Sequence, residues 1–495
     1  MALGLCACGS KKVAPEPEAE DPAAATDPID PDPDDPDEAP PPLSEFPDST
    51  RSLELVRTVS VRLAPAESAK RIGSIAIDTR IDWSKTAKGD GCKKSWIQMR
   101  PRGWICGDYV KPSTKPAFGR EVPMLDRGEL VPGVYGKVTA ASSVTYTFEK
   151  PKPEPKGKPK PRLPKPTGPV TSPDQVEPVA PTTPIATGPR LVEGRPLVGS
   201  VNVRQYEELV VDDKTYWKIS KQDPEYVLSK AIRQHQPSVF AGARLADDTG
   251  WALPVAFVWP RVAGWRQAYT THKEVGGGIN RTLAARTAIP ILETAAKAGK
   301  PTAYRIGAQE WIAAADVRVF QPTRPPKLLA PNERWIDVDL DSQIMVAFEG
   351  ELAVYATMVS TGGKETPTET GEYRMWLKES EADMKGLNGE DPYSVATVPW
   401  TQFFSPEKGL ALHTAYWHDQ FGTRRSHGCV NLAPRDARWL YFWSDPQVPP
   451  GWTMAAGVVE APGSIVRVRS KEDPEPEPKG YAKKVVEARQ QNAPR

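Results

Sequence analysis

The pattern of apolar and polar residues predicts a β-rich region in the last third of the chain. Residues 335–340 alternate apolar and polar side chains, as a half-buried strand does. Two further runs, 343–348 and 352–359, flank Glu349-Gly350-Glu351, which has the composition of a hairpin turn. Shorter runs of the same kind follow at 372–377 and 464–469. We therefore expect these runs to form strands.

One segment of the same region has a helical period instead. Residues 434–443 place apolar side chains at helical spacing, and Pro434 suits the first turn of a helix. Asp445-Pro446 follows directly, and a residue before proline disfavours helical backbone. The pattern predicts one short helix that ends before Asp445.

A weak repeat of short β-prone runs occupies the middle of the chain. Its runs lie at 73–77, 96–97 and 103–105, again at 199–203, 217–219 and 226–227, and in a shorter form at 304–306 and 311–312. Each set closes on an aromatic and a β-branched residue, which suits a small barrel. These units resemble bacterial Src-homology-3-like domains, which in cell-wall enzymes often bind wall peptides. The resemblance is clearest over residues 51–115, and the aromatic residues fit a core better than a binding platform.

Proline-rich segments separate these parts. Residues 14–50 hold thirteen acidic residues and eleven prolines with no basic residue, a composition that cannot bury a core and extends by self-repulsion. Residues 150–169 are also rich in proline, but carry seven basic residues against one glutamate. We interpret both segments as spacers, although the second could also contact an anionic surface.

At 495 residues the chain exceeds a single core, so we expect a mainly β, multidomain protein. The expected parts are a leader at 1–8, an acidic tether at 9–50, a Src-homology-3-like barrel at 51–115, a β extension at 120–149, a basic linker at 150–190, a barrel-like repeat region at 191–325, a last domain at 332–470 of mixed β-sheets with one short helix, and a disordered tail at 471–495.

Charge and hydropathy limit the partners. The net charge is +1, and the basic residues form no stripe that would follow nucleic-acid phosphates, so nucleic acid is not expected as a partner. No run reaches the roughly 20 apolar residues that span a bilayer. Ala7-Cys8-Gly9 resembles the end of a bacterial lipoprotein signal, although few residues precede it. Cys8 is therefore the predicted lipid anchor, and we expect a location on the periplasmic side of the cell envelope.

The cysteines agree with export. Cys92 and Cys106 lie fourteen residues apart in one small domain, where they form either a disulfide in an oxidising compartment or two buried thiols. Cys429 stands alone in the last domain. A leftover thiol in an exported protein requires an explanation.

Cys429 lies in Ser426-His427-Gly428-Cys429-Val430-Asn431, sixteen residues after His413. This order, a histidine followed after a spacer by the hexapeptide, resembles the signature of the L,D-transpeptidase (YkuD-like) catalytic domain. The resemblance covers about residues 332–470. It implies that Cys429 is the nucleophile and His413 the base, with the ring of His413 held by the backbone carbonyl of Thr414. It implies no metal and no cofactor.

The chemistry of acyl transfer explains these residue types. Thiolate is the nucleophile, and a free cysteine with a pKa of about 8.5 is mostly protonated at neutral pH. An imidazole must therefore take the proton during attack or hold the thiolate as an ion pair. Backbone N–H groups of Gly428 and Cys429 are the expected donors to the oxyanion.

The remaining candidates surround this pair. We expect Ser426 and Asn431 to fix the loop through hydrogen bonds to main chain, and His427 to shape the site. Arg425 could bind a substrate carboxylate or lie on the surface, and Tyr393 and Trp400 could line a groove or belong to the core. Three other histidines receive no role: His418 is expected on a loop surface, and His235 and His272 lie outside the domain.

The resemblance implies acyl transfer on peptidoglycan stem peptides. Cys429 would form a thioester, which an amine of a neighbouring stem peptide or of a protein would resolve. With water as acceptor the enzyme would be an L,D-carboxypeptidase. Two other classes of function stay open: a zinc site of His413, His418, His427 and Cys429, and a non-catalytic lipoprotein that binds the wall.

Overall fold

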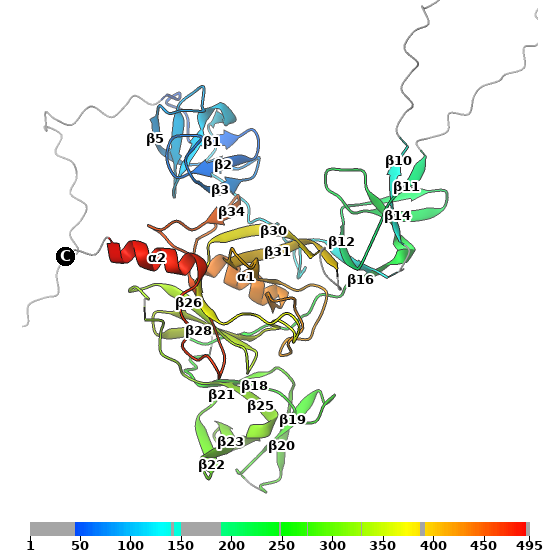
Figure 1. The fold of residues 1–495 in the computed structure, drawn as a ribbon, viewed down its shortest axis with the longest axis vertical. Coiled ribbons are helices and arrows are strands. Elements are labelled where there is room, and N and C mark those ends of the chain that lie inside the picture. The colour runs from blue at the N-terminus through cyan, green and yellow to red at the C-terminus, as the bar shows by residue number, and fades with distance from the viewer. Residues whose placement is uncertain are drawn as a thin grey trace, which may run out of the picture. The chain divides into compact units, whose positions relative to one another are not determined.

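The computed structural model describes residues 45–139, 143–149, 190–246, 249–274, 276–327, 329–386 and 392–491 (Figure 1). The predicted leader with Cys8, most of the acidic tether and nearly all of the basic linker lie outside these residues. The described residues form mainly strands, with two α-helices, so the predicted fold class is confirmed. Among them, no helix is long and apolar enough to cross a bilayer.

The predicted strands of the last domain build one sheet. They are β26 (Arg334–Asp339), β27 (Ile344–Glu349), β28 (Leu352–Met358), β29 (Gly371–Arg374) and β35 (Ile465–Arg469), which β17 (Ala243–Arg244) joins at the edge beside β28. The expectation of a half-buried β26 is wrong, because both of its faces are covered. Ile336 and Val338 lie in one hydrophobic cluster, whereas Trp335 lies in another and stacks on Phe348.

A second group of strands in this domain gave no clear sequence signal. These are β30 (Leu377–Gly386), β31 (Tyr393–Ser405), β32 (Leu410–Thr414), β33 (Val430–Leu432) and β34 (Trp452–Ala456). The predicted helix is present as α1 (Pro434–Trp443), with proline in its first turn and buried Leu440 and Tyr441 on its inner face. Helix α1 packs against β31 and β32, the strands that lead into the site.

Three smaller β units precede this domain, and each contains the sequence repeat as a hairpin, a single turn of 3-10 helix and a further strand. In the first unit, the elements are β1 (Ser52–Leu55), β2 (Val59–Arg62), β3 (Arg71–Ile75), β4 (Arg80–Ile81), β5 (Trp83–Ala87), β6 (Trp96–Met99), β7 (Trp104–Cys106), η1 (Gly107–Tyr109) and β8 (Val110–Ser113). A disulfide joins Cys92 to Cys106 in this unit. Its likeness to Src-homology-3-like domains stays a prediction.

The second and third units repeat the arrangement. The second holds β9 (Val134–Val138), β10 (Val144–Phe148), β11 (Leu191–Pro196), β12 (Ser200–Gln205), β13 (Glu207–Val211), β14 (Lys214–Lys218), β15 (Tyr226–Leu228), η2 (Ser229–Ala231) and β16 (Ile232–Gln234). The third holds β18 (Val255–Val258), β19 (Gln267–Thr271), β20 (Ile279–Ala284), β21 (Ala288–Pro290), β22 (Glu293–Lys297), β23 (Lys300–Gly307), β24 (Glu310–Ala313), η3 (Ala314–Asp316) and β25 (Val317–Phe320).

The structure corrects two predicted boundaries. Residues 120–149 are not a separate extension, because β9 pairs with β12 and β10 pairs with β11 across the linker, with Phe148 opposite Leu191. Residues 191–325 are not one region, because their strands divide between the second and third units. The basic linker therefore interrupts a folded unit between two neighbouring strands.

Two of the small units extend a sheet of the last domain by strand pairing. Strand β3 pairs antiparallel with β34, and β12 pairs in parallel with β31, with Asn202 opposite Val395. The result is one sheet that runs β16-β9-β12-β31-β30-β34-β3-β2-β7-β6-β5. This pairing brings β9, β12 and β16 beside the strands that carry the candidate site.

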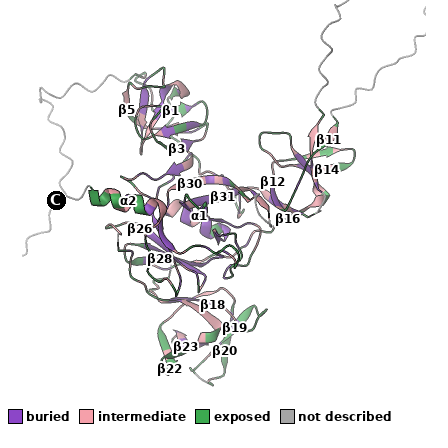
Figure 2. Cartoon of the chain, viewed as in Figure 1, coloured by how far each residue is buried: buried purple, intermediate pink, exposed green. Residues whose placement is uncertain are grey.

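The expected disordered tail is also wrong. Residues 480–491 form α2 (Gly480–Gln491), whose Ala482 and Val485 are buried while much of the rest of the helix is exposed (Figure 2). Arg489 makes an ion pair with Glu333 at 2.7 Å. Proline and charge predict disorder only where no apolar face exists, and two small apolar residues one turn apart are enough to dock this helix.

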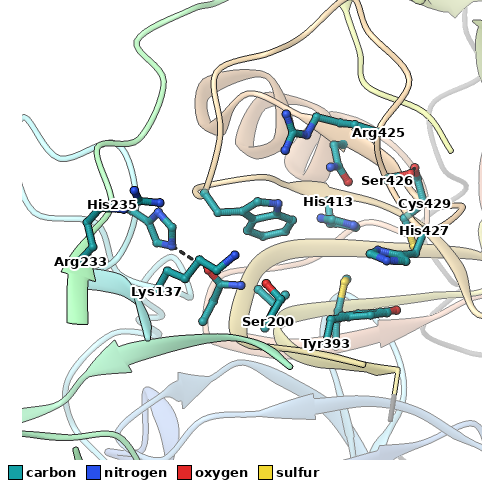
Figure 3. Close-up of a pocket in the computed structure, with 15 residues that line it drawn as sticks. Lys137, Ser200, Arg233, His235, Tyr393, His413, Arg425, Ser426, His427 and Cys429 are labelled. Atoms are coloured by element: carbon teal, nitrogen blue, oxygen red, sulfur yellow. Dashed lines mark hydrogen bonds between the residues drawn. The ribbon is translucent and has the colours of Figure 1, made fainter. Parts of the chain in front are cut away.

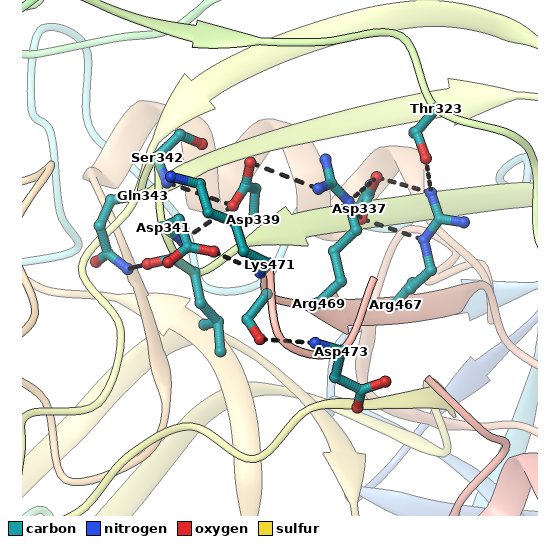
Figure 4. Close-up of polar contacts among 12 residues, drawn as sticks. Thr323, Asp337, Asp339, Asp341, Ser342, Gln343, Arg467, Arg469, Lys471 and Asp473 are labelled. Carbon is teal, nitrogen blue, oxygen red and sulfur yellow. Dashed lines mark hydrogen bonds and ion pairs between the residues drawn. The ribbon is translucent and has the colours of Figure 1, made fainter. Parts of the chain in front are cut away.

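A buried ion-pair network joins the neighbouring strands β26 and β35 (Figure 4). Asp337 is fully buried and contacts Arg467 at 2.7 Å and Arg469 at 2.9 Å. Arg469 also lies 3.5 Å from Asp339. Because Arg467 is almost as buried as Asp337, each charge depends on the other for its solvation.

We expect Asp337→Ala to lower the free energy of unfolding by about 3–5 kcal/mol, since it leaves buried arginine without its counter-charge. Chemical denaturation of the full chain measures this change. Glu351→Ala, at an exposed position in the same region, is the matched control and should change stability by less than about 0.5 kcal/mol. Equal effects of the two substitutions would contradict the proposed role of the network.

Candidate active site

Parallel pairing of β32 with β33 brings the two predicted catalytic residues together. His413 in β32 lies opposite Asn431 in β33, and Cys429 directly precedes β33. Strand β31 pairs with the other side of β32 and supports it. Two side chains that lie sixteen positions apart in the sequence thus line the same cavity.

The loop before Cys429 is held by hydrogen bonds to its neighbours. Ser426 accepts a hydrogen bond from Gly428 N at 3.2 Å and donates one to the carbonyl of Cys429, so its predicted role in fixing the loop agrees with its contacts. The Thr368 hydroxyl donates to the carbonyl of Gly428 at 2.7 Å. Gly428 has φ +115°, a backbone conformation that L side chains rarely adopt.

These contacts correct the predicted oxyanion donors. The N–H of Gly428 is occupied by Ser426, so it is not available to a substrate in this arrangement. Among the described residues, the N–H of Cys429 has no hydrogen-bond acceptor. The backbone therefore offers one free donor at the nucleophile, the N–H of Cys429 itself.

His413 is held in the tautomer that a base requires. Its Nδ1 lies 2.9 Å from the carbonyl oxygen of Thr414 and therefore carries the proton, which leaves Nε2 as the acceptor. The ring is buried, and this burial lowers its pKa to about 4, against a smaller opposing effect of the Thr414 carbonyl. The imidazole is consequently neutral near pH 7.

Cys429 is half-buried, the single free thiol among the described cysteines. Burial raises the pKa of its thiol to about 11. Because the ring of His413 favours its neutral form as well, both groups rest uncharged. Of the two arrangements that sequence reasoning left open, the site therefore favours proton transfer during attack over a standing thiolate–imidazolium pair.

His418 lies on a loop, as expected, but it is half-buried and has two polar partners that were not expected. Its Nδ1 accepts a hydrogen bond from Gln420 N at 3.1 Å, and its Nε2 lies 3.0 Å from the side-chain amide of Asn431. Burial, followed by the charge of Arg425, lowers the pKa of His418 to about 3. His418 thus orients Asn431, whose side chain was expected to bind main chain instead.

The aromatic candidates separate into two groups. Tyr393 lines the cavity and stacks on His427, with ring centroids 4.4 Å apart. Trp400 is completely buried in the core, so of the two places left open for it the structure favours the core. Both residues are large and aromatic, so the sequence could not tell which one faces the cavity. The side to which each points depends on its register on β31.

The cavity beside Cys429 has a volume of about 280 Å³ and receives side chains from two parts of the chain (Figure 3). The catalytic domain contributes His413, Arg425 and His427 among others, and both of the last two are exposed. The second β unit contributes residues that sequence reasoning missed, namely Lys137, Ser200, Asn202, Arg233 and His235. No local signal marks them, since only the pairing of β12 with β31 brings them to the site.

The contacts do not support the zinc alternative. Both ring nitrogens of His418 have protein partners, so the ring offers no lone pair to a metal beside Cys429. Within the described residues, one group of three metal-ligand side chains lies close together, Cys92, Cys106 and Asp108, and its cysteines form the disulfide.

Comparison with known proteins agrees with this geometry. Residues 333–468 match the family model of the L,D-transpeptidase catalytic domain. A search of curated proteins gives no match.

Solved structures of L,D-transpeptidases resemble parts of the chain. A mutant of the Enterococcus faecium enzyme is 26% identical over 30% of this chain and 55% of its own, with a TM-score of 0.23. The catalytic domain of the same organism's enzyme is 26% identical over 28% of this chain and 98% of its own, with a TM-score of 0.22. A Mycobacterium smegmatis enzyme is 17% identical over 48% of this chain and 89% of its own, with a TM-score of 0.23.

The chain spans about half the length of the first two solved structures that it matches. The assignment depends on the family model, whose matched residues include Cys429 and His413, and on the single cavity that both line. Residues 333–468 of this chain are a catalytic domain of the L,D-transpeptidase family.

Proposed function

We propose that the chain is a cysteine-dependent L,D-transpeptidase that acts on peptidoglycan stem peptides through a thioester on Cys429. One observation carries the proposal: the thiol of Cys429 and the ring of His413 line one cavity, and the contact of Nδ1 with Thr414 leaves Nε2 to accept a proton. The match of residues 333–468 to the family model supports the reaction class.

The first half of the reaction forms the acyl-enzyme. Sγ of Cys429 attacks the carbonyl carbon of the third stem residue while Nε2 of His413 takes the thiol proton. The N–H of Cys429 donates to the oxyanion of the tetrahedral intermediate. The C–N bond to the terminal D-alanine then breaks, and the imidazolium returns the proton to the departing amine, which leaves a thioester and a neutral ring.

The second half transfers the acyl group. An acceptor amine attacks the thioester carbonyl and gives a proton to His413, and the C–S bond breaks as the amide forms. The sulfur regains its proton from the imidazolium, so the enzyme returns to its starting state. A half-buried thiol in a cavity of about 280 Å³ favours an acceptor held by the protein over bulk water.

We extend the proposal to the cell envelope. A disulfide such as Cys92–Cys106 persists in oxidising compartments, and the proposed substrate is part of the wall. Attachment through a lipid on Cys8 stays a prediction, as does a protein amine as acceptor.

Adduct formation with a carbapenem tests the nucleophile and the base. We expect one covalent adduct on Cys429 of the wild-type chain, none on Cys429→Ala, and a rate lowered on the order of 1000-fold or more in His413→Ala. Mass spectrometry of the intact chain and its peptides gives the site and the rate. His418→Ala is the control: it loses only the orientation of Asn431 and should slow the reaction by no more than about 10-fold.

If His418→Ala and His413→Ala were equally slow, the assignment of the base to His413 would be wrong. If an adduct formed on Cys429→Ala, the assignment of the nucleophile would be wrong.

The pH dependence of acylation tests whether the Cys429 thiol and the His413 ring are both uncharged at rest. The pKa of His413 is lowered to about 4 and that of Cys429 is raised to about 11, so the competent form, neutral ring and protonated thiol, exists between those values. We expect the single-turnover rate of adduct formation to rise as pH increases through about 4 and to stay level from about pH 6 to pH 9. A resting ion pair predicts the opposite at high pH, a rate that falls as the imidazolium loses its proton.

Product analysis tests the acceptor. With a stem tetrapeptide and a second stem peptide as amine, we expect a product in which the third residue of the donor is joined by an amide to the acceptor, together with free D-alanine. Chromatography with mass detection separates this product from the tripeptide that water would give. Tripeptide alone would identify an L,D-carboxypeptidase.

A further inference from the structure

One wall of the catalytic cavity comes from outside the catalytic domain. Lys137 on β9 lies opposite Asn202 on β12 on one side and opposite Arg233 on β16 on the other. Residues directly opposite in an antiparallel pair project to the same face of the sheet, so these side chains form one row. All three line the cavity that holds Cys429 (Figure 3).

The charged side chains that line this cavity are all positive. Lys137, Arg233 and Arg425 line it, and its lining residues include no carboxylate. Within the described parts of the chain, none of these three cations has an ion-pair partner. The imidazole of His235, also in the lining, does not add to the charge, because burial and then the nearby Arg233 and Lys137 lower its pKa to about 4.

The arrangement has a cost that a ligand would offset. Like charges directly opposite in a sheet destabilise the pair, and here Lys137 faces Arg233 without a neutralising side chain. A neutral contact holds the base of the wall, since Nε2 of His235 lies 2.8 Å from the amide oxygen of Asn202. A cavity wall that carries unpaired cations is typical of an anion site, and guanidinium matches the geometry of a carboxylate.

We propose that Lys137 and Arg233 form, with Arg425, a carboxylate-binding wall of the catalytic cavity, through which the second β unit selects acyl donors that carry a free carboxylate on the side chain of the third residue, the residue whose carbonyl reacts. This proposal rests on the proposed function for the identity of the donor. The thiol of Cys429 and the three cations line the same cavity of about 280 Å³, so a donor bound at the thiol lies in the cavity that the wall faces.

The test compares two synthetic stem tetrapeptides that differ only in a carboxylate or a carboxamide on the side chain of the third residue. Binding to the full chain with Cys429→Ala is measured by calorimetry, because this variant cannot form a thioester. We expect the carboxylate peptide to bind on the order of 10-fold or more tighter than the carboxamide. Adding Lys137→Met and Arg233→Gln should abolish this preference and leave the affinity for the carboxamide peptide unchanged.

A matched control removes two cations from the same unit at exposed positions away from the cavity, Lys214→Met and Lys230→Met. It should keep the preference, which excludes a general effect of net charge. The exchange Lys137→Arg with Arg233→Lys retains both charges and should keep most of it, which excludes misfolding as the cause. Equal binding of the two peptides to the Cys429→Ala chain, or a preference that survives Lys137→Met with Arg233→Gln, would overturn the proposal.

Turnover distinguishes this proposal from the proposed function. If the wild-type chain transfers neither peptide but the preference in binding is present and depends on Lys137 and Arg233, the wall stands and the proposed reaction fails. If both peptides are transferred with equal kcat/KM, the reaction stands and the wall fails.

Discussion

The parallel pairing of β32 with β33 is the constraint on which the site depends. It places His413 beside Asn431 and delivers Cys429 at the start of β33, from a loop that Ser426 and Thr368 hold by hydrogen bonds. Both strands are buried in the catalytic domain, so neither can shift its register without exposing apolar residues. The chemistry of the site is thus a consequence of how tightly this small parallel pair is packed.

Burial also determines how the pair works. Removing water from around the thiol and the ring disfavours the charged form of each, which raises the pKa of Cys429 and lowers that of His413. A thiolate would be the stronger resting nucleophile, but burial of the thiol disfavours its charged form. The tautomer fixed by Thr414 supplies a base at the moment of attack instead, and a neutral thiol is less exposed to oxidation between turnovers.

The sequence predicts those features that have a local cause. Alternation and turn composition predict β26, β27, β28, β29 and β35, and Pro434 marks the start of α1. The hexapeptide around Cys429 indicates the nucleophile. Strand β31 has no such signal, because Thr397 and Trp400 adopt positive φ angles and interrupt the regular alternation.

Other features depend on contacts between distant residues, and the sequence does not reveal them. The loop position of His418 gives no sign of its contact with Asn431, and the sequence leaves Trp400 open between groove and core until its register on β31 is known. His235 lies 178 residues before His413 in the chain and lines the same cavity. The roles of these three residues were left open or missed for one reason. Their contacts are with residues far away in the sequence, so the residues next to them in the chain do not reveal those contacts.

The contact of the second β unit with the catalytic domain has two structural effects: it covers the edge of β31, and it fixes the register of the strands that form the cavity wall. Without β12, the edge of β31 would leave backbone N–H and C=O groups unpaired next to the active site, a position open to strand addition by another chain. The parallel pairing of Asn202 with Val395 covers that edge and fixes the register of the next strands. A slip of one residue would turn Lys137 to the opposite face of the sheet. The register that protects the edge is therefore the one that keeps the wall facing the thiol.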